Sequence, residues 1–323
     1  MFSPFSNPPL ENVNINMGAI LSTLGRVWFA IVLLIPMLVT ALVIKLLSFC
    51  LKKKTLNGTS VVLISYAWRL SLALTPWMWI TSAKKYSEKL TKLNEQVRAR
   101  AQGEDGARPV FLLGNHTSFL DTILTITRLT TSIAYQSRTY MSAHLFKLPI
   151  LSTICVGCGH FSVPYKGSGD DDFSVDKVKI AETQKKVDEH IESNGVLCFF
   201  PEGAMNGNPK EIRSIRYGGM QKALDYDAII WIFMTNGNHV LWPRKSQIGG
   251  LPGYGQYTMK ELAPIGCREL VNKLKKQLSK EDLGKKKDSQ LLSEYIRIQM
   301  QGEWDDLLEG SSREGVEMQK KNE

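Results

Sequence analysis

The sequence predicts an α/β fold in which a mainly parallel sheet is flanked by helices and preceded by an N-terminal membrane-associated helical hairpin. Three observations lead to this prediction. After residue 110, short apolar runs alternate with helical stretches, the pattern of strands in a parallel sheet. The chain of 323 residues is 43% hydrophobic, enough for a sizeable core. Two longer apolar segments precede the alternating region.

Residues 1–20 are rich in Pro and Asn and are expected to form a flexible N-terminus, because they lack the basic start of a cleaved signal peptide. Residues 27–44 then carry no charge over a length that just crosses a bilayer, and Pro36 is expected to kink them. Lysines follow at positions 45 and 52–54, and the positive-inside rule places them at a cytosolic membrane edge.

A second apolar segment, residues 60–83, contains Arg69 and several tryptophans, whose rings favour the membrane–water interface. We interpret it as lying in or dipping into the membrane, so that residues 21–83 form the membrane-associated part. A hairpin keeps the lysines and the following domain on the same, cytosolic side, whereas two full spans separate them. The alternative interpretation is that both segments are buried helices of a soluble core.

Net charge and cysteine usage narrow the class of protein. The net charge is +9, and residues 1–110 carry 13 Lys or Arg against 5 Asp or Glu. A basic flank beside apolar segments suits an anionic membrane surface, and no nucleic-acid-binding motif competes for the charge. The 5 cysteines are irregularly spaced, which indicates a reducing compartment. Cys155 and Cys158 form one CxxC without a second ligand pair, so we expect no metal site.

The remaining elements follow in chain order. Residues 84–109 are charged and polar and contain a Gly-rich linker, so the domain boundary belongs there and the α/β domain is expected to span residues 84–266. From residue 267 to 323 the chain is strongly charged and predicts a solvated helical tail with a frayed end. Strands are expected at 110–113, within 151–163, at 196–200 and at 228–234, helices at 118–129 and 175–193, and a loop at 167–172.

The segment GNHTSFLD, residues 114–121, directly follows the first strand. His116 then lies in the turn at the carboxyl edge of the sheet, where α/β folds place their sites. Asp121 falls in the first turns of the next helix, from which its carboxylate reaches back to the imidazole. Such a carboxylate fixes the tautomer and leaves the other ring nitrogen free to accept a proton. The alternative is a pair whose members satisfy each other only structurally.

A second carboxylate and glycine, Glu202 and Gly203, follow the strand at 196–200. If the strands are parallel, these residues lie at the same edge as His116. Glycine lets the backbone approach a ligand closely, and its amide can face an anion. The alternative is a simple turn at Pro201 and Gly203.

Together the two segments resemble the glycerolipid and lysophospholipid acyltransferase family. That family carries an Asn-His-x-x-x-x-Asp block, matched from Asn115 to Asp121, and a Phe-Pro-Glu-Gly block, matched from Phe200 to Gly203. The resemblance implies an enzyme that moves an acyl group from acyl-CoA, a co-substrate rather than a cofactor, to the free hydroxyl of a lysophospholipid, above all lysophosphatidic acid. It implies His116 and Asp121 as the catalytic pair, without a covalent acyl-enzyme, and Asn115, Glu202 and Gly203 as substrate-binding residues.

Two departures from the family pattern concern the acceptor phosphate. Ala204 and Met205 stand where the family has Thr-Arg, and Pro164 stands where the family's Phe-x-x-Arg block ends in arginine. We expect Lys166 and Arg213 to bind the substrate instead, with Lys210 and Arg216 as further candidates. Lysine is a poorer bidentate partner for phosphate. The acceptor therefore stays open between lysophosphatidic acid, another lysophospholipid and glycerol phosphate.

The missing arginines also leave an alternative function: a catalytically weak or inactive, membrane-anchored lipid-binding protein of the same fold. A serine hydrolase is not expected, because the sequence has no Gly-x-Ser-x-Gly elbow. A nucleotide-dependent kinase is not expected without a Gly-rich phosphate loop. The expected location is the endoplasmic reticulum membrane, with the catalytic domain facing the cytosol and membrane lipids as partners.

Overall fold

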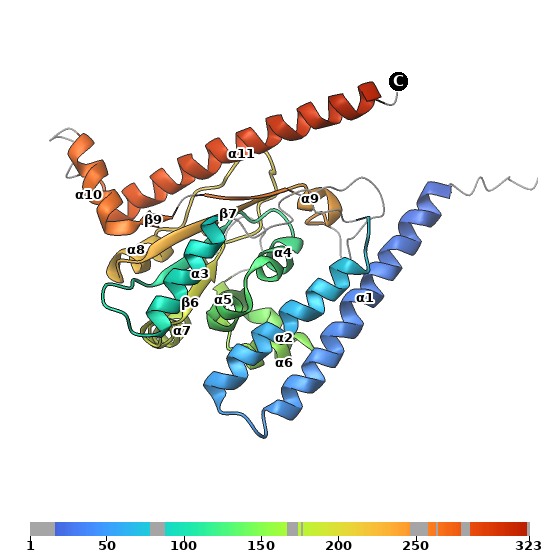
Figure 1. The fold of residues 1–323 in the computed structure, drawn as a ribbon, viewed down its shortest axis with the longest axis horizontal. Coiled ribbons are helices and arrows are strands. Elements are labelled where there is room, and N and C mark those ends of the chain that lie inside the picture. The colour runs from blue at the N-terminus through green and yellow to red at the C-terminus, as the bar shows by residue number, and fades with distance from the viewer. Residues whose placement is uncertain are drawn as a thin grey trace, which may run out of the picture.

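The computed structural model describes residues 17–77, 88–166, 174–175, 177–245, 258–262, 264–278 and 285–321. A central sheet lies between two layers of helices, and a pair of antiparallel helices extends along one side of the molecule (Figure 1). The predicted α/β fold with an N-terminal helical pair is therefore confirmed. The predicted loop at 167–172 and residues 1–16 of the predicted flexible N-terminus lie outside the described residues. Residues 17–20, also predicted to be flexible, instead form the start of the helix Met17–Leu47, because the apolar helical stretch begins earlier than expected.

The main sheet has the strand order β3-β2-β6-β1-β7-β8, with β9 also paired to β7. Strands β1 to β3, β6 and β7 are parallel, and β8 and β9 run antiparallel to β7. A small hairpin pairs β4 with β5. The strands are β1 (Val110–Gly114), β2 (Ser137–Ser142), β3 (Phe161–Val163), β4 (Tyr165–Lys166), β5 (Ser174–Val175), β6 (Val196–Phe199), β7 (Ile229–Asn236), β8 (Thr258–Glu261) and β9 (Ile265–Gly266).

Alternate residues of the central strands face opposite helical layers, as the period of a strand requires. In β1, Val110 and Leu112 pack towards the first helical layer. This layer consists of α1 (Met17–Leu47), α2 (Lys53–Ala73), α3 (Glu88–Ala101), α4 (Leu120–Arg128), α5 (Thr131–Gln136) and α6 (Leu151–Gly157). Phe111 and Leu113 pack towards α7 (Lys177–Glu192), α8 (Tyr217–Asp225), α10 (Cys267–Gln277) and α11 (Asp288–Lys321). Because β1 is central and buried on both faces, the turn that follows it is firmly positioned.

Helices α1 and α2 form the hairpin. One face of α1 is buried through side chains at four-residue spacing, Phe29, Leu33 and Met37, while the opposite face exposes large apolar side chains. The hydroxyl of Ser71 on α2 donates to the carbonyl of Val32, 2.6 Å away on α1. The hairpin thus has one side against the α/β domain and one apolar side turned outward.

The second apolar segment, predicted to lie in or dip into the membrane, forms a helix with one face buried against the α/β domain. Helix α2 begins at Lys53, and its buried face, which includes Val61, Ile64 and Trp68, packs against α4, α5 and α6. Arg69 donates to the carbonyls of Thr127 and Leu129 at 3.0 and 2.7 Å, so it completes the carboxyl end of α4. The Arg69 charge within the apolar segment is therefore satisfied by carbonyls of the α/β domain. The alternative interpretation, a buried helix, applies to this face of α2. Residues 78–83 lie outside the described residues.

The C-terminal region also differs from the prediction of a solvated tail. Leu292, Ile296, Met300 and Trp304 of α11 are all at most 1% exposed and join the core on the α8 side of the sheet. Their four-residue spacing forms a narrow apolar stripe on an otherwise charged helix, which the high charge content obscured. The α/β domain therefore continues beyond residue 266 through α10 and α11.

Candidate active site

His116 lies in the turn between β1 and α4, at the carboxyl edge of the parallel strands. Its ring Nδ1 is 3.0 Å from Oδ2 of Asp121, which is fully buried in the first turn of α4. The same oxygen accepts from the amides of Thr117 and Ser118 at 2.6 and 2.9 Å. The expected reach of the carboxylate back to the imidazole is therefore present, and three donors converge on one carboxylate oxygen.

The second ring nitrogen of His116 is left for chemistry. With Nδ1 donating to Asp121, the neutral ring has a free acceptor at Nε2, and no hydrogen bond to Nε2 is found within the described ranges. The His116 side chain is 18% exposed. It stacks on the ring of Phe200, with the centroids 4.0 Å apart and the planes 10° from parallel. The ring is held from one face and one edge, as a positioned general base requires.

Glu202 binds the His116 turn to the loop after β6. Its Oε1 accepts from the amide of His116 at 2.9 Å, and its Oε2 accepts from the amide of Arg213 and from Nδ2 of Asn206, both at 3.0 Å. Glu202 is 2% exposed, and burial raises the pKa of its carboxyl, although these hydrogen bonds oppose the rise. The structure brings the two sequence motifs together through Glu202, and its direct contact with substrate stays a prediction.

Gly203 has a φ of +79°, which favours glycine. A Cβ at this position would also lie 2.9 Å from Cγ of Arg216, so glycine lets the Arg216 stem pass over the loop. Gly207 in the same loop similarly faces the guanidinium of Arg244, 2.8 Å from where a Cβ would lie. Sequence analysis missed Arg244, because it lies between β7 and β8 and belongs to no motif.

The other predicted substrate-binding residues differ in what the structure shows. Asn115 is 1% exposed, and its amide group bonds to the backbone of Thr235 in both directions at 2.8 Å. These two hydrogen bonds link the end of β1 to the end of β7, so the structure shows a structural role for Asn115. Arg213 is half-buried in the loop bound by Glu202. Lys166 lies in β4, and its side chain is outside the described part of the chain.

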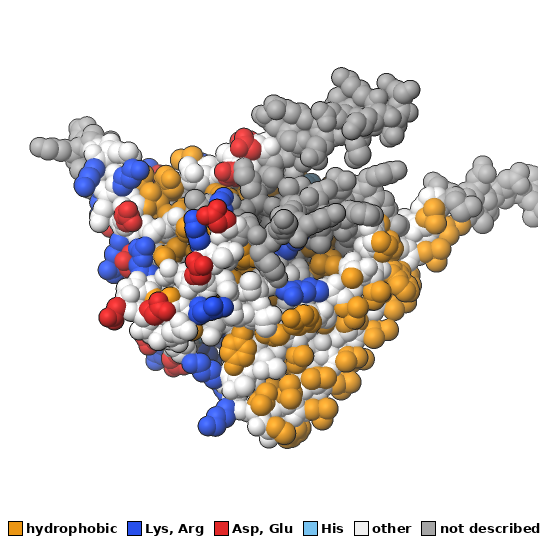
Figure 2. Space-filling model, viewed as in Figure 1, with side chains coloured by type: hydrophobic (Ala, Val, Ile, Leu, Met, Phe, Trp, Pro, Cys, Tyr) orange, Lys and Arg blue, Asp and Glu red, His pale blue; other side chains and the backbone are white. Residues whose placement is uncertain are grey.

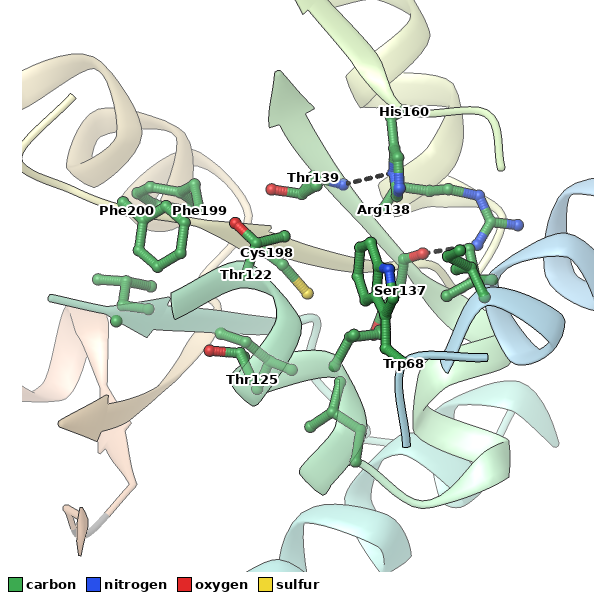
Figure 3. A pocket seen from close by; sticks show the side chains of 17 residues that line it. Trp68, Thr122, Thr125, Ser137, Arg138, Thr139, His160, Cys198, Phe199 and Phe200 are labelled. Carbon is green, nitrogen blue, oxygen red and sulfur yellow. Dashed lines mark hydrogen bonds between the residues drawn. The ribbon is translucent and has the colours of Figure 1, made fainter. Parts of the chain in front are cut away.

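An apolar cavity lies between the sheet and helices α2 and α4 (Figure 3), and one of its lining residues, Phe200, stacks on His116. Its volume is about 50 Å³. Gly114 and Phe200 line the end nearest His116, and Arg138 and His160 lie at the other end, which Figure 3 shows across the sheet from Phe200. Cys198 of β6 and Thr125 of α4 face each other across the middle. Sequence analysis did not predict this cavity, because its walls come from five separate elements, α2, β1, α4, β2 and β6.

The buried thiols of Cys155 and Cys198 show no sign of reactive chemistry. Burial raises the pKa of Cys155 to about 11 and that of Cys198 to about 12, so both thiols stay protonated at neutral pH. Burial lowers the pKa of His160 to about 3, which keeps its ring neutral beside the cavity. Within the described ranges, no group of three His, Cys, Asp or Glu side chains could hold a metal ion.

A histidine–carboxylate pair at the edge of a parallel sheet is an arrangement that general-base chemistry can use. Residues 87–240 match the family model described as Acyltransferase, so this part of the chain is an acyltransferase domain. No curated protein matches the sequence. The fold is similar to the crystal structure of the 1-acyl-sn-glycerophosphate (LPA) acyltransferase PlsC from Thermotoga maritima, with a TM-score of 0.61 and 13% identity over 90% of this chain and 98% of that chain.

Proposed function

We propose that this protein transfers a fatty acyl group from acyl-CoA to the free hydroxyl of a lysophospholipid, with lysophosphatidic acid as acceptor and phosphatidic acid as product. The observation that carries the proposal is the His116–Asp121 pair, which leaves Nε2 of His116 without a hydrogen bond among the described residues and stacks through His116 on Phe200, a residue that lines an apolar cavity. A lipid substrate needs an apolar site beside the reacting group, and the family supplies the reaction class.

The residues support a direct transfer. His116 Nε2 takes the proton from the acceptor hydroxyl while the hydroxyl oxygen attacks the thioester carbonyl. Asp121 stabilises the imidazolium that forms. When the tetrahedral intermediate collapses, the C–S bond breaks, and the CoA sulfur leaves with the proton that His116 had taken. Acyl group and proton are both conserved in these steps, so no covalent acyl-enzyme and no further cofactor are required.

The apolar cavity supports binding of the acyl chain. At about 50 Å³ it is narrow, so a long chain enters only as the lining side chains shift. We expect Cys198→Phe, which fills the middle of the cavity, to lower turnover with long-chain acyl-CoA by about tenfold and to spare short-chain donors, because roughly 0.8 kcal/mol is lost for each methylene left unburied. A panel of acyl-CoA lengths measures this, and an unchanged chain-length profile would place the acyl chain elsewhere.

Arg213 and Lys166 are proposed to bind the acceptor phosphate. We expect Arg213→Ala and Lys166→Ala to raise the acceptor KM about tenfold and the acyl-CoA KM less, because a charged hydrogen bond to the acceptor is lost. Arg98→Ala, which removes an exposed arginine on α3, is the matched control. If acceptor kinetics are unchanged in both variants, neither side chain belongs to the site, and Arg216 and Arg244 become the next candidates.

Membrane attachment through α1 is the proposed localisation, with the endoplasmic reticulum as the membrane and the catalytic domain on its cytosolic side. Among the described residues, the only helix long and apolar enough to cross a bilayer is Gly18–Leu47, and 39% of its 18-residue apolar window is buried within the protein. Its exposed apolar side chains form a continuous face in Figure 2. Because the other face packs on α2 and α6, we favour a hairpin seated in one leaflet over a full span.

Carbonate extraction of membranes from expressing cells tests this attachment. We expect the full-length chain to stay in the membrane pellet, because alkaline carbonate releases proteins held only by surface charge. An α1 variant with Leu34, Leu38 and Leu42, which are exposed on the apolar face, each replaced by Ser is expected to move towards the soluble fraction. Recovery of the unaltered chain in the soluble fraction would contradict the assignment.

One assay decides the proposed function. Membranes containing the protein are incubated with labelled acyl-CoA and with lysophosphatidic acid, other lysophospholipids and glycerol phosphate. We expect labelled phosphatidic acid, absent with the His116→Ala variant. Binding of a lysolipid without transfer to any acceptor would instead favour the inactive lipid-binding protein, the alternative that the missing family arginines suggest.

A further inference from the structure

A buried amide from a distant part of the chain contacts the carboxylate of the catalytic pair. Asn238, the first residue of α9 (Asn238–Leu241), is fully buried. Its Nδ2 donates to Oδ1 of Asp121, the carboxylate oxygen that His116 does not use, and to the hydroxyl of Thr235 at 3.0 Å. The two oxygens of Asp121 are thus held from opposite sides, one by the His116 turn and one by Asn238.

The amide orientation follows from the neighbouring bonds. The hydroxyl of Thr235 donates its hydrogen to Oδ1 of Asn115 at 3.2 Å, so it faces Asn238 as an acceptor. Asp121 also presents an acceptor oxygen, and both contacts therefore require the NH₂ group of Asn238. Asn115, Thr235 and Asn238 form a fully buried line of polar groups from the end of β1, through the end of β7, to the start of α4.

We propose that Asn238 is a positioning residue for acyl transfer, which fixes the rotation of the Asp121 carboxylate so that Oδ2 stays on Nδ1 of His116. This inference rests on the proposed function of the same site. Asp121 is 0% exposed, so water cannot replace a lost donor at Oδ1. Without Asn238, Oδ1 of Asp121 has lost its donor. The carboxylate is then stabilised by rotating, so that both oxygens share the three donors of the His116 turn, which are Nδ1 of His116 and the amides of Thr117 and Ser118. The imidazole no longer has one fixed acceptor after this rotation.

The alternative is that the network only stabilises the fold. The two roles separate because a stabilising role changes the folded fraction, whereas a positioning role changes each folded molecule. His239, the next residue, is the other titratable group that Asp121 influences; burial lowers its pKa, and the Asp121 charge partly opposes this. His239 is kept in all the variants compared below.

Asn238→Ala is the first test variant. We expect kcat per folded molecule to fall about 10–100-fold, with both substrate KM values nearly unchanged, because a hydrogen bond to a charged group is lost from the base and not from the substrate sites. Val240→Ala, at an exposed position of the same short helix, should retain full activity. Full activity of folded Asn238→Ala would overturn the proposal.

Asn238→Asp keeps the shape and supplies a second variant should the alanine protein fail to fold. Two carboxylates in contact share one proton, and that proton replaces the amide donor only while it is bound. We therefore expect the ratio of its kcat to that of the unaltered protein to rise as the pH falls. A ratio that does not change with pH would overturn the proposal, because a purely structural defect has no reason to follow this proton.

A readout that needs no turnover keeps the inference separate from the proposed function. The chain has 5 histidines, so ¹⁵N-histidine labelling in detergent gives few signals, and His116→Ala identifies the one from His116. We expect a single Nδ1–H tautomer in the unaltered protein and a tautomer mixture in Asn238→Ala. An unchanged tautomer would overturn the role of Asn238. Absence of acyl transfer by the unaltered protein would overturn the proposed function, while the tautomer comparison still decides the inference.

Discussion

His116→Ala is expected to reduce the rate of acyl transfer by about 10²–10⁴-fold, because it removes the group that accepts the proton of the attacking hydroxyl. The side chain is 18% exposed and its ring packs on Phe200, so the substitution leaves a small gap at the surface rather than a core cavity. Turnover is measured on detergent-purified protein and expressed per folded molecule, as judged from thermal unfolding. A folded variant that transfers acyl groups at the unaltered rate would remove His116 from the mechanism.

Asp121→Asn provides the control for the pair. An amide oxygen can still accept at the Oδ2 position, but it brings no negative charge to the imidazolium, so turnover should again fall strongly. The new amide places its NH₂ group opposite the NH₂ group of Asn238, so the folded fraction of this variant is measured beside its turnover. The double variant should be no slower than His116→Ala, since the two side chains act as one unit. Additive losses would mean that Asp121 acts apart from His116.

The central site was predictable because local sequence decides it. His116 and Asp121 are five residues apart, they follow an apolar run, and a strand–turn–helix connection leaves few ways to arrange them. The strand before Glu202 was equally clear, and parallel pairing of β1 with β6 places both motifs at one edge. Each step depends on short-range patterns, which a single sequence records well.

The parts that sequence reasoning missed depend on contacts between distant segments. Asn238 lies 117 residues beyond Asp121, and only the pairing of β7 beside β1 brings the two together. From the sequence, Arg69 is interpreted as a charge within an apolar membrane segment. In the structure its guanidinium donates a hydrogen bond to the carbonyl of Thr127 in α4. Strand β2 was not predicted, since Ser137–Ser142 is polar and only two of its residues are fully buried. A sequence pattern indicates whether a residue is buried or exposed, but it does not identify the distant residues that the side chain contacts.

Glu202→Ala is expected to lower kcat by about 10²-fold and to reduce stability, even though Glu202 itself takes no proton. The substitution leaves the amides of His116 and Arg213 and the side chain of Asn206 without their acceptor in a buried loop. Each unpaired buried donor costs about 1–3 kcal/mol. The His116 turn should therefore shift, and a displacement of about 1 Å is enough for such a loss of rate.

Glu202→Gln separates this positioning role from direct acceptor binding. The amide keeps the shape and one acceptor oxygen, but its NH₂ group faces a donor at the other position, so one side of the bridge opens. If Glu202 acts through the loop, kcat falls in both variants, the unfolding temperature falls with it, and the acceptor KM changes little. If Glu202 instead holds the acceptor, the KM for the lysophospholipid rises while kcat at saturation and the unfolding temperature stay near those of the unaltered protein. Because both carboxylate oxygens are already bonded within the protein, we expect the first result.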